Sequence, residues 1–194
     1  MAYHHGDLPA ALIAAGLEVT RKGGPQALTL RELTRRAGVT PNAAYRHFPD
    51  RKSLVAAVSG AIQQRMAESM TALFSEDHQP VERLRAVGMG YIRFALSEPG
   101  WFSVAFFGAG IPKQPSLDEA LPYVALTTVL DDMVQSGDLA PERRPEAPWA
   151  CWSAVHGFAE LALHGPLQDA DEEAVERAAQ ATVDAAIEGI RARA

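Results

Sequence analysis

Residues 29–51 read TLRELTRRAGVTPNAAYRHFPDR and carry the clearest structural signals in the chain. Thr29 and Glu32 form a capping-box pattern, in which the hydroxyl accepts from an orphan helix N–H and the glutamate reaches back to the cap. Gly38 stands where a left-handed C-terminal cap is expected, and Thr40 then restarts a helix as its N-cap. Two short helices joined by so short a turn must cross steeply, which is the helix-turn-helix arrangement.

Helical periodicity continues through almost the whole chain, without a clear alternating strand pattern flanked by hairpin signals. Glycine and proline divide the sequence into about nine expected helices. They cover residues 8–22, 30–37, 41–47, 50–75, 80–97, 99–107, 116–136, 147–164 and 171–191. We therefore predict an all-α fold. A three-helix helix-turn-helix head occupies residues 1–52, and a helical regulatory and dimerisation domain occupies residues 53–194.

The composition excludes several classes of protein. The chain has 194 residues, of which 47% are apolar, and a single cysteine. One cysteine excludes an intrachain disulfide framework and a multi-thiolate metal site. Because the longest apolar run is too short to cross a bilayer and the N-terminus lacks a signal-peptide pattern, we expect a cytoplasmic protein without a membrane partner.

Charge is distributed unevenly along the chain. Residues 1–52 hold eight basic and four acidic residues, whereas residues 53–194 hold ten basic and twenty acidic residues. A small basic head on an acidic body indicates that the head meets a polyanion while the body has another task. Chance clustering of solvated charges is the alternative explanation.

Residues 40–51 resemble the recognition-helix signature of the tetracycline-repressor (TetR) family of transcription regulators. That signature pairs a Tyr-x-His-Phe run, here Tyr45 to Phe48, with a following proline, a small polar residue and a basic residue. The resemblance extends back through residues 30–39 and to the opening residues 3–8. It implies a DNA-binding protein whose third helix enters the major groove, acting as a homodimer on a pseudo-palindromic operator and most often as a repressor.

The candidate DNA contacts follow from this resemblance and from side-chain chemistry. Asn42 and Arg46 lie one turn apart, and these residue types pair bidentately with adenine and guanine. Tyr45 and His47 can donate to phosphate oxygens, as the family's equivalents contact the backbone. The full predicted set is Thr29, Thr40, Pro41, Asn42, Tyr45, Arg46, His47 and Arg51.

Each of these roles has a structural alternative. Asn42 can bond locally in the first helical turn, and Arg46 can contact phosphate alone. The rings of Tyr45 and His47 can pack in the core of the head with only their polar tips exposed. For the whole motif, the alternative is a head that docks protein, in a ligand-sensing or adaptor module.

The acidic body is expected to dimerise. In the TetR family the last two helices pair with the partner's copies, which here implies residues 147–164 and 171–191. A small-residue stripe of Val175, Ala179, Thr182 or Val183, Ala186 and Ile190 suits a helix–helix seam, although a core helix can show the same stripe. The run Trp152 to Gly157 resembles a Trp/His-Gly-type C-terminal domain of one TetR subgroup.

A small-molecule effector of undefined identity is expected in the body, because the family's regulatory pocket lies between its middle helices. Apolar pockets with a few polar groups are the usual small-molecule sites. The candidate lining residues are Trp101, Phe102, Phe106, Tyr123, Trp152 and His156, although most of the chain's aromatic residues are expected in the core. Residues 108–115 form either a gate to this pocket or a simple connector.

Catalysis, a resident metal and a cofactor are not expected. Cys151 and His156 are separated by about 140° around one helix, so they do not pair as nucleophile and base. His156 and His164 lie about 12 Å apart along the same helix, which is too far to share a metal. The sequence also contains no phosphate-binding glycine loop and no nucleophile elbow.

Overall fold

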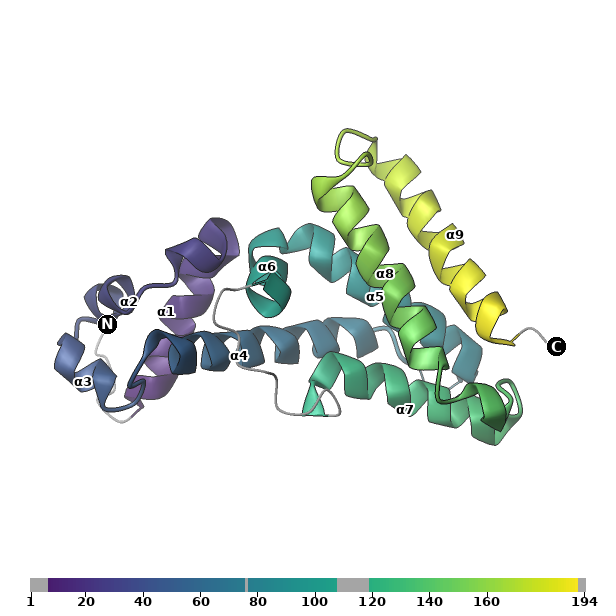
Figure 1. The fold of residues 1–194 in the computed structure, drawn as a ribbon, viewed down its shortest axis with the longest axis horizontal. Coiled ribbons are helices and arrows are strands. Elements are labelled where there is room, and N and C mark those ends of the chain that lie inside the picture. Colours follow the sequence, from purple (N-terminus) through teal and green to yellow (C-terminus); the bar gives the residue numbers. More distant parts are fainter. Residues whose placement is uncertain (1–6, 76, 108–118, 192–194) are drawn as a thin grey trace. The chain divides into compact units, whose positions relative to one another are not determined.

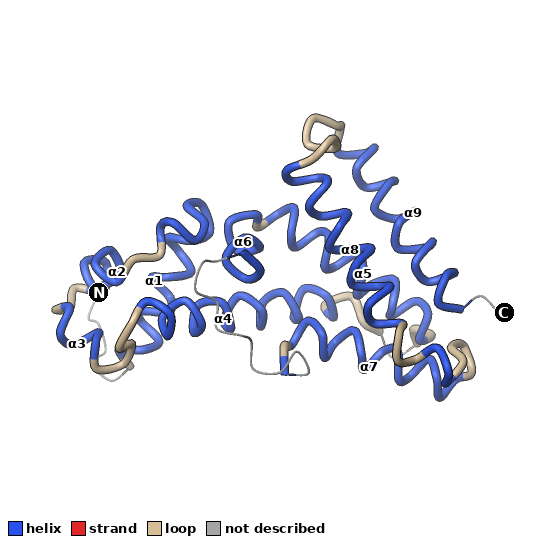
Figure 2. Tube along the Cα trace, in the orientation of Figure 1, coloured by secondary structure: helices blue, strands red, loops and turns tan. Residues whose placement is uncertain are grey.

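The computed structural model describes residues 7–75, 77–107 and 119–191, and within these ranges the chain is helical without strands (Figures 1 and 2). The helices are α1 (Leu8–Gly23), α2 (Leu30–Ala37), α3 (Pro41–Tyr45), α4 (Arg51–Thr71), α5 (Pro80–Ser97), α6 (Pro99–Phe107), α7 (Leu121–Ser136), α8 (Ala147–His164) and α9 (Glu172–Arg191). Two 3-10 turns, η1 (Gly24–Ala27) and η3 (Pro141–Arg143), complete the order. The predicted all-α fold is confirmed. Across the described ranges, every helix falls short of the length or the apolar character that spanning a bilayer requires.

The helix bounds differ from the sequence prediction by two residues or more at three places. The fourth helix ends at Thr71 instead of residue 75, where the amide of Phe74 turns back to the Thr71 carbonyl at 3.0 Å. The third ends at Tyr45 rather than residue 47. The seventh begins at Leu121, because Pro122 lacks an amide hydrogen and fits only the first helical turn. Its predicted start at residues 116–118 lies outside the described residues.

The chain forms two compact units. The first unit contains the described residues 7–64 and 98–107, and the second contains the described residues of 65–97 and 119–191. The chain therefore passes from the first unit into the second within α4 and returns at Glu98. The predicted boundary after residue 52 separates a DNA-binding part from a regulatory part, whereas the compact units separate within α4. The functional boundary stays a prediction.

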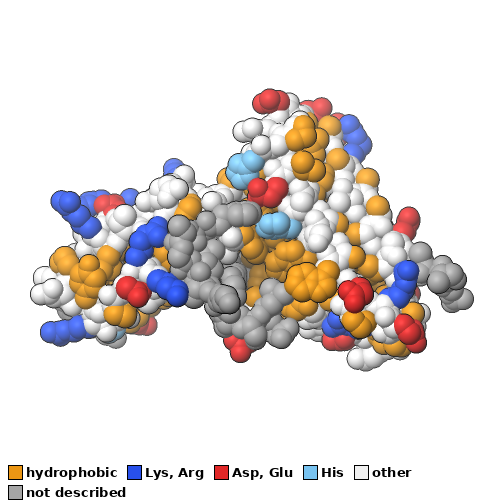
Figure 3. All heavy atoms as spheres, in the orientation of Figure 1, with side chains coloured by type: hydrophobic (Ala, Val, Ile, Leu, Met, Phe, Trp, Pro, Cys, Tyr) orange, Lys and Arg blue, Asp and Glu red, His pale blue; other side chains and the backbone are white. Residues whose placement is uncertain are grey.

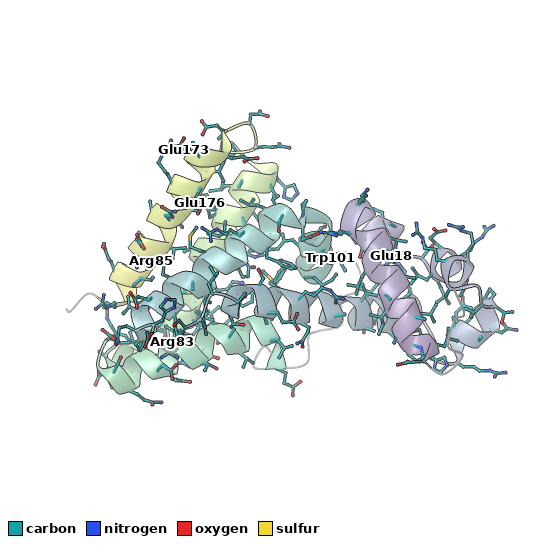
Figure 4. The ribbon with its side chains drawn as sticks, turned by 180° about the vertical axis from the view of Figure 1, so that it is seen from behind. Glu18, Arg83, Arg85, Trp101, Glu173 and Glu176 are labelled. Carbon is teal, nitrogen blue, oxygen red and sulfur yellow. The ribbon has the colours of Figure 1, made fainter. Side chains whose placement is uncertain are left out.

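In the first unit, α6 packs closely on the end of α1. A Cβ atom at Gly100 would overlap the backbone carbonyl oxygens of Thr20 and Arg21. The indole N–H of Trp101 donates to the Leu17 carbonyl at 2.8 Å, and Glu98 accepts two hydrogen bonds from the Arg21 guanidinium. Figure 4 shows Trp101 beside α1. Backbone contact, a hydrogen bond and an ion pair thus hold α6 in place.

In the second unit, α5 packs against α7, α8 and α9. Its buried face includes Tyr91 and Ile92, each 1% exposed. At the surface, Arg85 donates to Asp184 at 2.6 Å and Arg93 pairs with Glu176, so two ion pairs also join α5 to α9 (Figure 4). These contacts make α5 the central helix of the unit.

The face of α9 that the sequence suggested for dimerisation is largely its inner face. Ala179, Val183 and Ile190, which belong to the predicted stripe, are buried within the chain's own second unit. A second set of small residues lies about 160–260° around the helix from Val183, and its members are exposed or half-buried. They are Ala174, Ala178, Ala181, Thr182, Ala185 and Gly189. Three members of the predicted stripe therefore pack in the chain's own core, because helical periodicity does not say which of two apolar faces meets the core, and a dimer seam on α9 stays a prediction.

Gly100 provides a direct test of the α1–α6 packing. We expect Gly100→Ala to lower the free energy of unfolding by about 1–3 kcal/mol, because a side chain there displaces one backbone from another. Gly60→Ala is the matched control, since a Cβ at Gly60 meets no atom within 4 Å and alanine favours a helix interior. Urea denaturation followed by circular dichroism measures both changes, and equal stability of the two variants would contradict the packing described.

Candidate functional site

The helix-turn-helix head is built from three local signals that behave as the sequence predicts. The Thr29 hydroxyl accepts from the Glu32 amide at 3.3 Å, and the Thr40 hydroxyl accepts from the Ala43 amide at 3.4 Å. Gly38 adopts the left-handed conformation, with φ 66° and ψ 30°. The two caps and the glycine therefore stop α2 and start α3 where the sequence predicts.

The second half of the predicted capping box is wrong. The Glu32 carboxylate accepts two hydrogen bonds from Arg35, at 2.9 and 2.7 Å, and one from Arg36 at 2.8 Å. The Thr29 amide donates instead to the Ala27 carbonyl at 3.0 Å. Three hydrogen bonds from two positively charged guanidinium groups outweigh the one bond that the cap amide offers, so the glutamate turns outward along α2.

α3 presents a polar, exposed face and is anchored by a buried one. Ala44 is fully buried and Phe48 is 7% exposed. The Phe48 amide bonds the Ala44 carbonyl at 2.9 Å, so a helical turn continues past the end of α3. Asn42 and Arg46 consequently stay one turn apart, and both side chains are exposed. The structure thus brings the two predicted base-reading residues onto one surface.

The other predicted DNA contacts surround this face, and all of them are exposed. Tyr45 has 52% of its surface exposed, so most of its ring projects away from the head's core. Arg51 begins α4, and its guanidinium donates to the Pro25 carbonyl at 3.1 Å. Asp50 caps α4 by accepting from the Ser53 amide at 2.7 Å, a cap that the sequence reasoning missed although its spacing was readable.

In the second unit, an apolar cavity lies among α5, α7, α8 and α9, with Met70 of α4 at its wall. Every described side chain that lines it is uncharged. The lining contains Leu84, Val87, Tyr91, Leu126, Cys151, Trp152, Val155, Val183 and Ile187, among others. Of the predicted effector-site residues, Trp152 lines this cavity directly.

Two further predicted residues lie next to the cavity. The Tyr91 hydroxyl and His156 Nδ1 share a hydrogen bond of 2.7 Å, and the ring centroids of Tyr123 and Trp152 are 5.9 Å apart. Burial, reinforced by the Glu160 charge, raises the pKa of Tyr91 above its usual range. Burial also lowers the pKa of His156, against the opposing effect of Glu160. Tyr91 therefore stays protonated, and burial favours a neutral imidazole.

The remaining three candidates belong to α6 and the first unit. Trp101 donates a hydrogen bond to the Leu17 carbonyl of α1. The Arg21 guanidinium lies over the indole, with its central carbon 5.2 Å from the centroid of the Trp101 ring. Phe102 is fully buried, with its ring centroid 5.0 Å from that of Phe106. The contacts described for Trp101 are with α1, and Phe102 and Phe106 contact each other. Their role at an effector site stays a prediction.

Nucleophilic and metal chemistry receive little support from the geometry. Burial raises the pKa of the Cys151 thiol to about 11, so the thiol is protonated at neutral pH. Within residues 7–75, 77–107 and 119–191, no three His, Cys, Asp or Glu side chains converge as a metal site would require.

Two family models match the chain. One, described as bacterial regulatory proteins of the tetR family, matches residues 12–58. The other, described as a tetracyclin repressor-like C-terminal domain, matches residues 84–186, which is more than half of the chain. The chain belongs to the TetR family. The first match covers most of α1, all of α2 and α3, and the start of α4, and the second covers most of the unit that holds the cavity.

Solved structures of similar proteins match nearly the whole chain. A structure of a Rhodococcus protein of unknown function has a TM-score of 0.75 at 24% identity and covers 99% of this chain and 100% of that one. A TetR variant from Acinetobacter baumannii in complex with minocycline has a TM-score of 0.68 at 20% identity, with the same coverage. Both likenesses concern the fold.

A curated relative is similar over a shorter stretch. The nucleoid occlusion factor SlmA of Vibrio cholerae is 27% identical over 77 residues, 40% of this chain. The match spans 39% of that relative's own length.

The Glu32 ion pairs of this TetR-family head predict a pH dependence. Hydrogen bonds from Arg35 and then Arg36 lower the pKa of Glu32 from 4.5 to about 2. A carboxyl whose pKa is lower in the folded state stabilises the fold above pH 4.5, and this contribution is lost as pH falls toward about 2. We therefore expect the Glu32→Gln variant to lose less stability than the unaltered chain as the pH falls from 4.5 to about 2.

Carboxyl titration by NMR checks the cause. Replacing both arginines with glutamine should return the Glu32 pKa toward 4.5, whereas Glu68→Gln, a change elsewhere on the surface, should leave it low. A Glu32 pKa near 4.5 in the unaltered chain would contradict the ion pairs.

Proposed function

We propose that the chain is a ligand-responsive transcriptional repressor that binds a pseudo-palindromic DNA operator as a homodimer, with α3 in the major groove. The observation that carries this proposal is the exposed face of α3. It holds Asn42, Tyr45 and Arg46 on a turn that Ala44 and Phe48 anchor in the head. A major groove is wide enough for a helix, and asparagine and arginine are the side chains that pair bidentately with adenine and guanine.

The phosphate contacts are proposed for the residues around this face. The hydroxyl of Tyr45 and the imidazole of His47 are exposed at the end of α3, and Thr29 and Thr40 are exposed at the starts of α2 and α3. Such contacts fix the orientation of a protein on DNA without reading its sequence. Arg51 holds the Pro25 carbonyl here, so contact with phosphate requires it to share or exchange that bond.

Dimerisation is proposed through the outer faces of α8 and α9. Leu161 is 48% exposed on α8, and the small residues of α9 listed above face away from the unit's core. At Gly157 and Gly189 a Cβ atom would meet nothing within 4 Å, so a second copy can approach both helices closely. Two heads held in this way would reach two half-sites about one helical turn, or a multiple of it, apart.

The effector site is proposed at the apolar cavity of the second unit. One similar structure was solved with minocycline, which supports a small-molecule site in this fold. A ligand that binds one arrangement of the dimer better than another would shift the population away from the DNA-binding form. Repression is proposed from the family resemblance, and we propose no enzymatic activity.

Selection of bound fragments from a random DNA library, repeated at two salt concentrations, tests the proposal. We expect an enriched pseudo-palindrome whose binding weakens with salt, because phosphate contacts release counterions. Asn42→Ala should relax the preference at one base position and cost about 1–3 kcal/mol for the preferred site. Tyr45→Phe should instead weaken binding to all sequences alike.

Gln26→Ala is the control, since Gln26 is exposed in the first unit but lies on η1 rather than α3. No enrichment at either salt, from protein that was stripped of ligand and refolded, would favour the head as a protein-docking module instead. An unchanged preference profile for Asn42→Ala would refute its base-reading role.

The dimer interface has its own test. Ala181→Lys places a charge on the outer small-residue face of α9, so we expect it to convert dimers into monomers in sedimentation velocity. Gln180→Lys is the matched control, because that exposed side chain lies about 100° around the helix, on the side of Glu176. If both variants remain dimeric, the interface lies elsewhere.

A further inference from the structure

One face of α8 carries an ordered series of side chains. Trp149, Trp152, His156 and Glu160 are separated by three or four residues, so they lie in line along the helix. This face differs from the core face and from the outer face that holds Gly157 and Leu161. Figure 3 shows hydrophobic side chains gathered over α8, with histidine and acidic side chains next to them.

Aromatic rings from α5 and α7 extend this line into a continuous surface. The Tyr123 ring lies 6.4 Å from Trp149 and 5.9 Å from Trp152, and the Tyr91 ring lies 5.6 Å from Trp152, measured between centroids. Trp149 is 55% exposed, whereas Tyr91 is 1% exposed. The surface therefore runs from solvent to the wall of the apolar cavity, and Trp149 is too exposed to be explained as core.

A carboxylate stands at the end of this surface. Glu160 Oε2 lies 3.2 Å from His164 Nδ1. Glu160 Oε1 is buried and lacks a hydrogen-bond partner within the part of the chain that the structure describes. The charge of Glu160 also acts on Tyr91 and on His156. A buried carboxylate oxygen without a donor is costly, so a positive or hydrogen-bonding group placed there would be bound favourably.

The rings and the carboxylate of this face attract the same kind of group. Aromatic rings present negative potential at their faces and attract cations, most strongly when the cation is desolvated. The described lining of the neighbouring cavity is uncharged, and the imidazole of His156 is held toward its neutral form by burial. Apolar surface, ring faces and a carboxylate together favour an apolar ligand that carries a positive charge, and they disfavour an anion.

We infer that this site takes an organic cation with an apolar body, such as an arylalkyl ammonium, whose body lies on the rings of Trp152 and Tyr123 and whose charge is directed along α8 toward the Glu160 carboxylate. The inference rests on the proposed function, since it names the chemical class of the effector at the proposed site. Its test is binding in the absence of DNA, so that it fails or succeeds independently of operator recognition.

Benzyltrimethylammonium and neopentylbenzene are suitable probes, because they have nearly the same shape and differ by one positive charge. Isothermal titration calorimetry of the full chain should show at least about tenfold tighter binding of the cation. Phenylmethanesulfonate, which carries a negative charge on a similar body, should bind more weakly than both. Glu160→Gln should remove most of the preference for the cation and leave binding of the neutral probe unchanged.

Glu173→Gln is the matched control, since this glutamate is 86% exposed on α9 and pairs with Arg177 away from the aromatic face. Equal binding of the cation and the neutral probe would overturn the inference. So would a preference that survives Glu160→Gln, or the absence of binding by either probe at millimolar concentration. If the chain selects an operator but shows no charge preference, the inference fails alone; if the preference is present without DNA binding, the proposed function fails alone.

Discussion

The contact of α6 with the end of α1 determines how the first unit is assembled. Glycine at position 100 lets two backbones meet, and the Arg21–Glu98 ion pair joins residues 77 positions apart in the sequence. The helix-turn-helix head therefore shares its compact unit with a helix that follows α5. Because the chain leaves this unit within α4, returns at Glu98 and leaves it again between α6 and α7, three covalent connections link the head to the unit that holds the cavity.

The second unit divides its surfaces by helix face. On α8, one face packs in the core through Cys151 and Val155, a second carries Gly157 and Leu161, and a third carries the aromatic line that ends at Glu160. A helix has room for three such faces because successive residues advance by about 100°. One helix can therefore serve packing, a partner chain and a ligand with different residues, and changes at one face need not disturb the others.

Local signals made much of the fold predictable, whereas long-range contacts did not. Caps at Thr29 and Thr40 and the glycine at position 38 depend on neighbouring residues, so the sequence identifies them. The direction of the Glu32 side chain depends on competition between a cap and two arginines. The phase of α9 depends on which apolar face meets α5. The contacts of Trp101 with α1 join distant segments, so helical periodicity gave no reason to separate it from Trp152.

The ion pairs on α2 bear on how a head of this kind would discriminate among DNA sequences. Arg35 and Arg36 satisfy their charge on Glu32, and Arg36 also lies 3.5 Å from Glu18. Affinity for any DNA rises with the number of phosphates that basic residues neutralise, independently of sequence. Two arginines that are paired with carboxylates contribute little to this sequence-independent affinity. In the proposed complex, a larger share of the binding free energy therefore comes from the α3 face, where Asn42 and Arg46 distinguish one base pair from another.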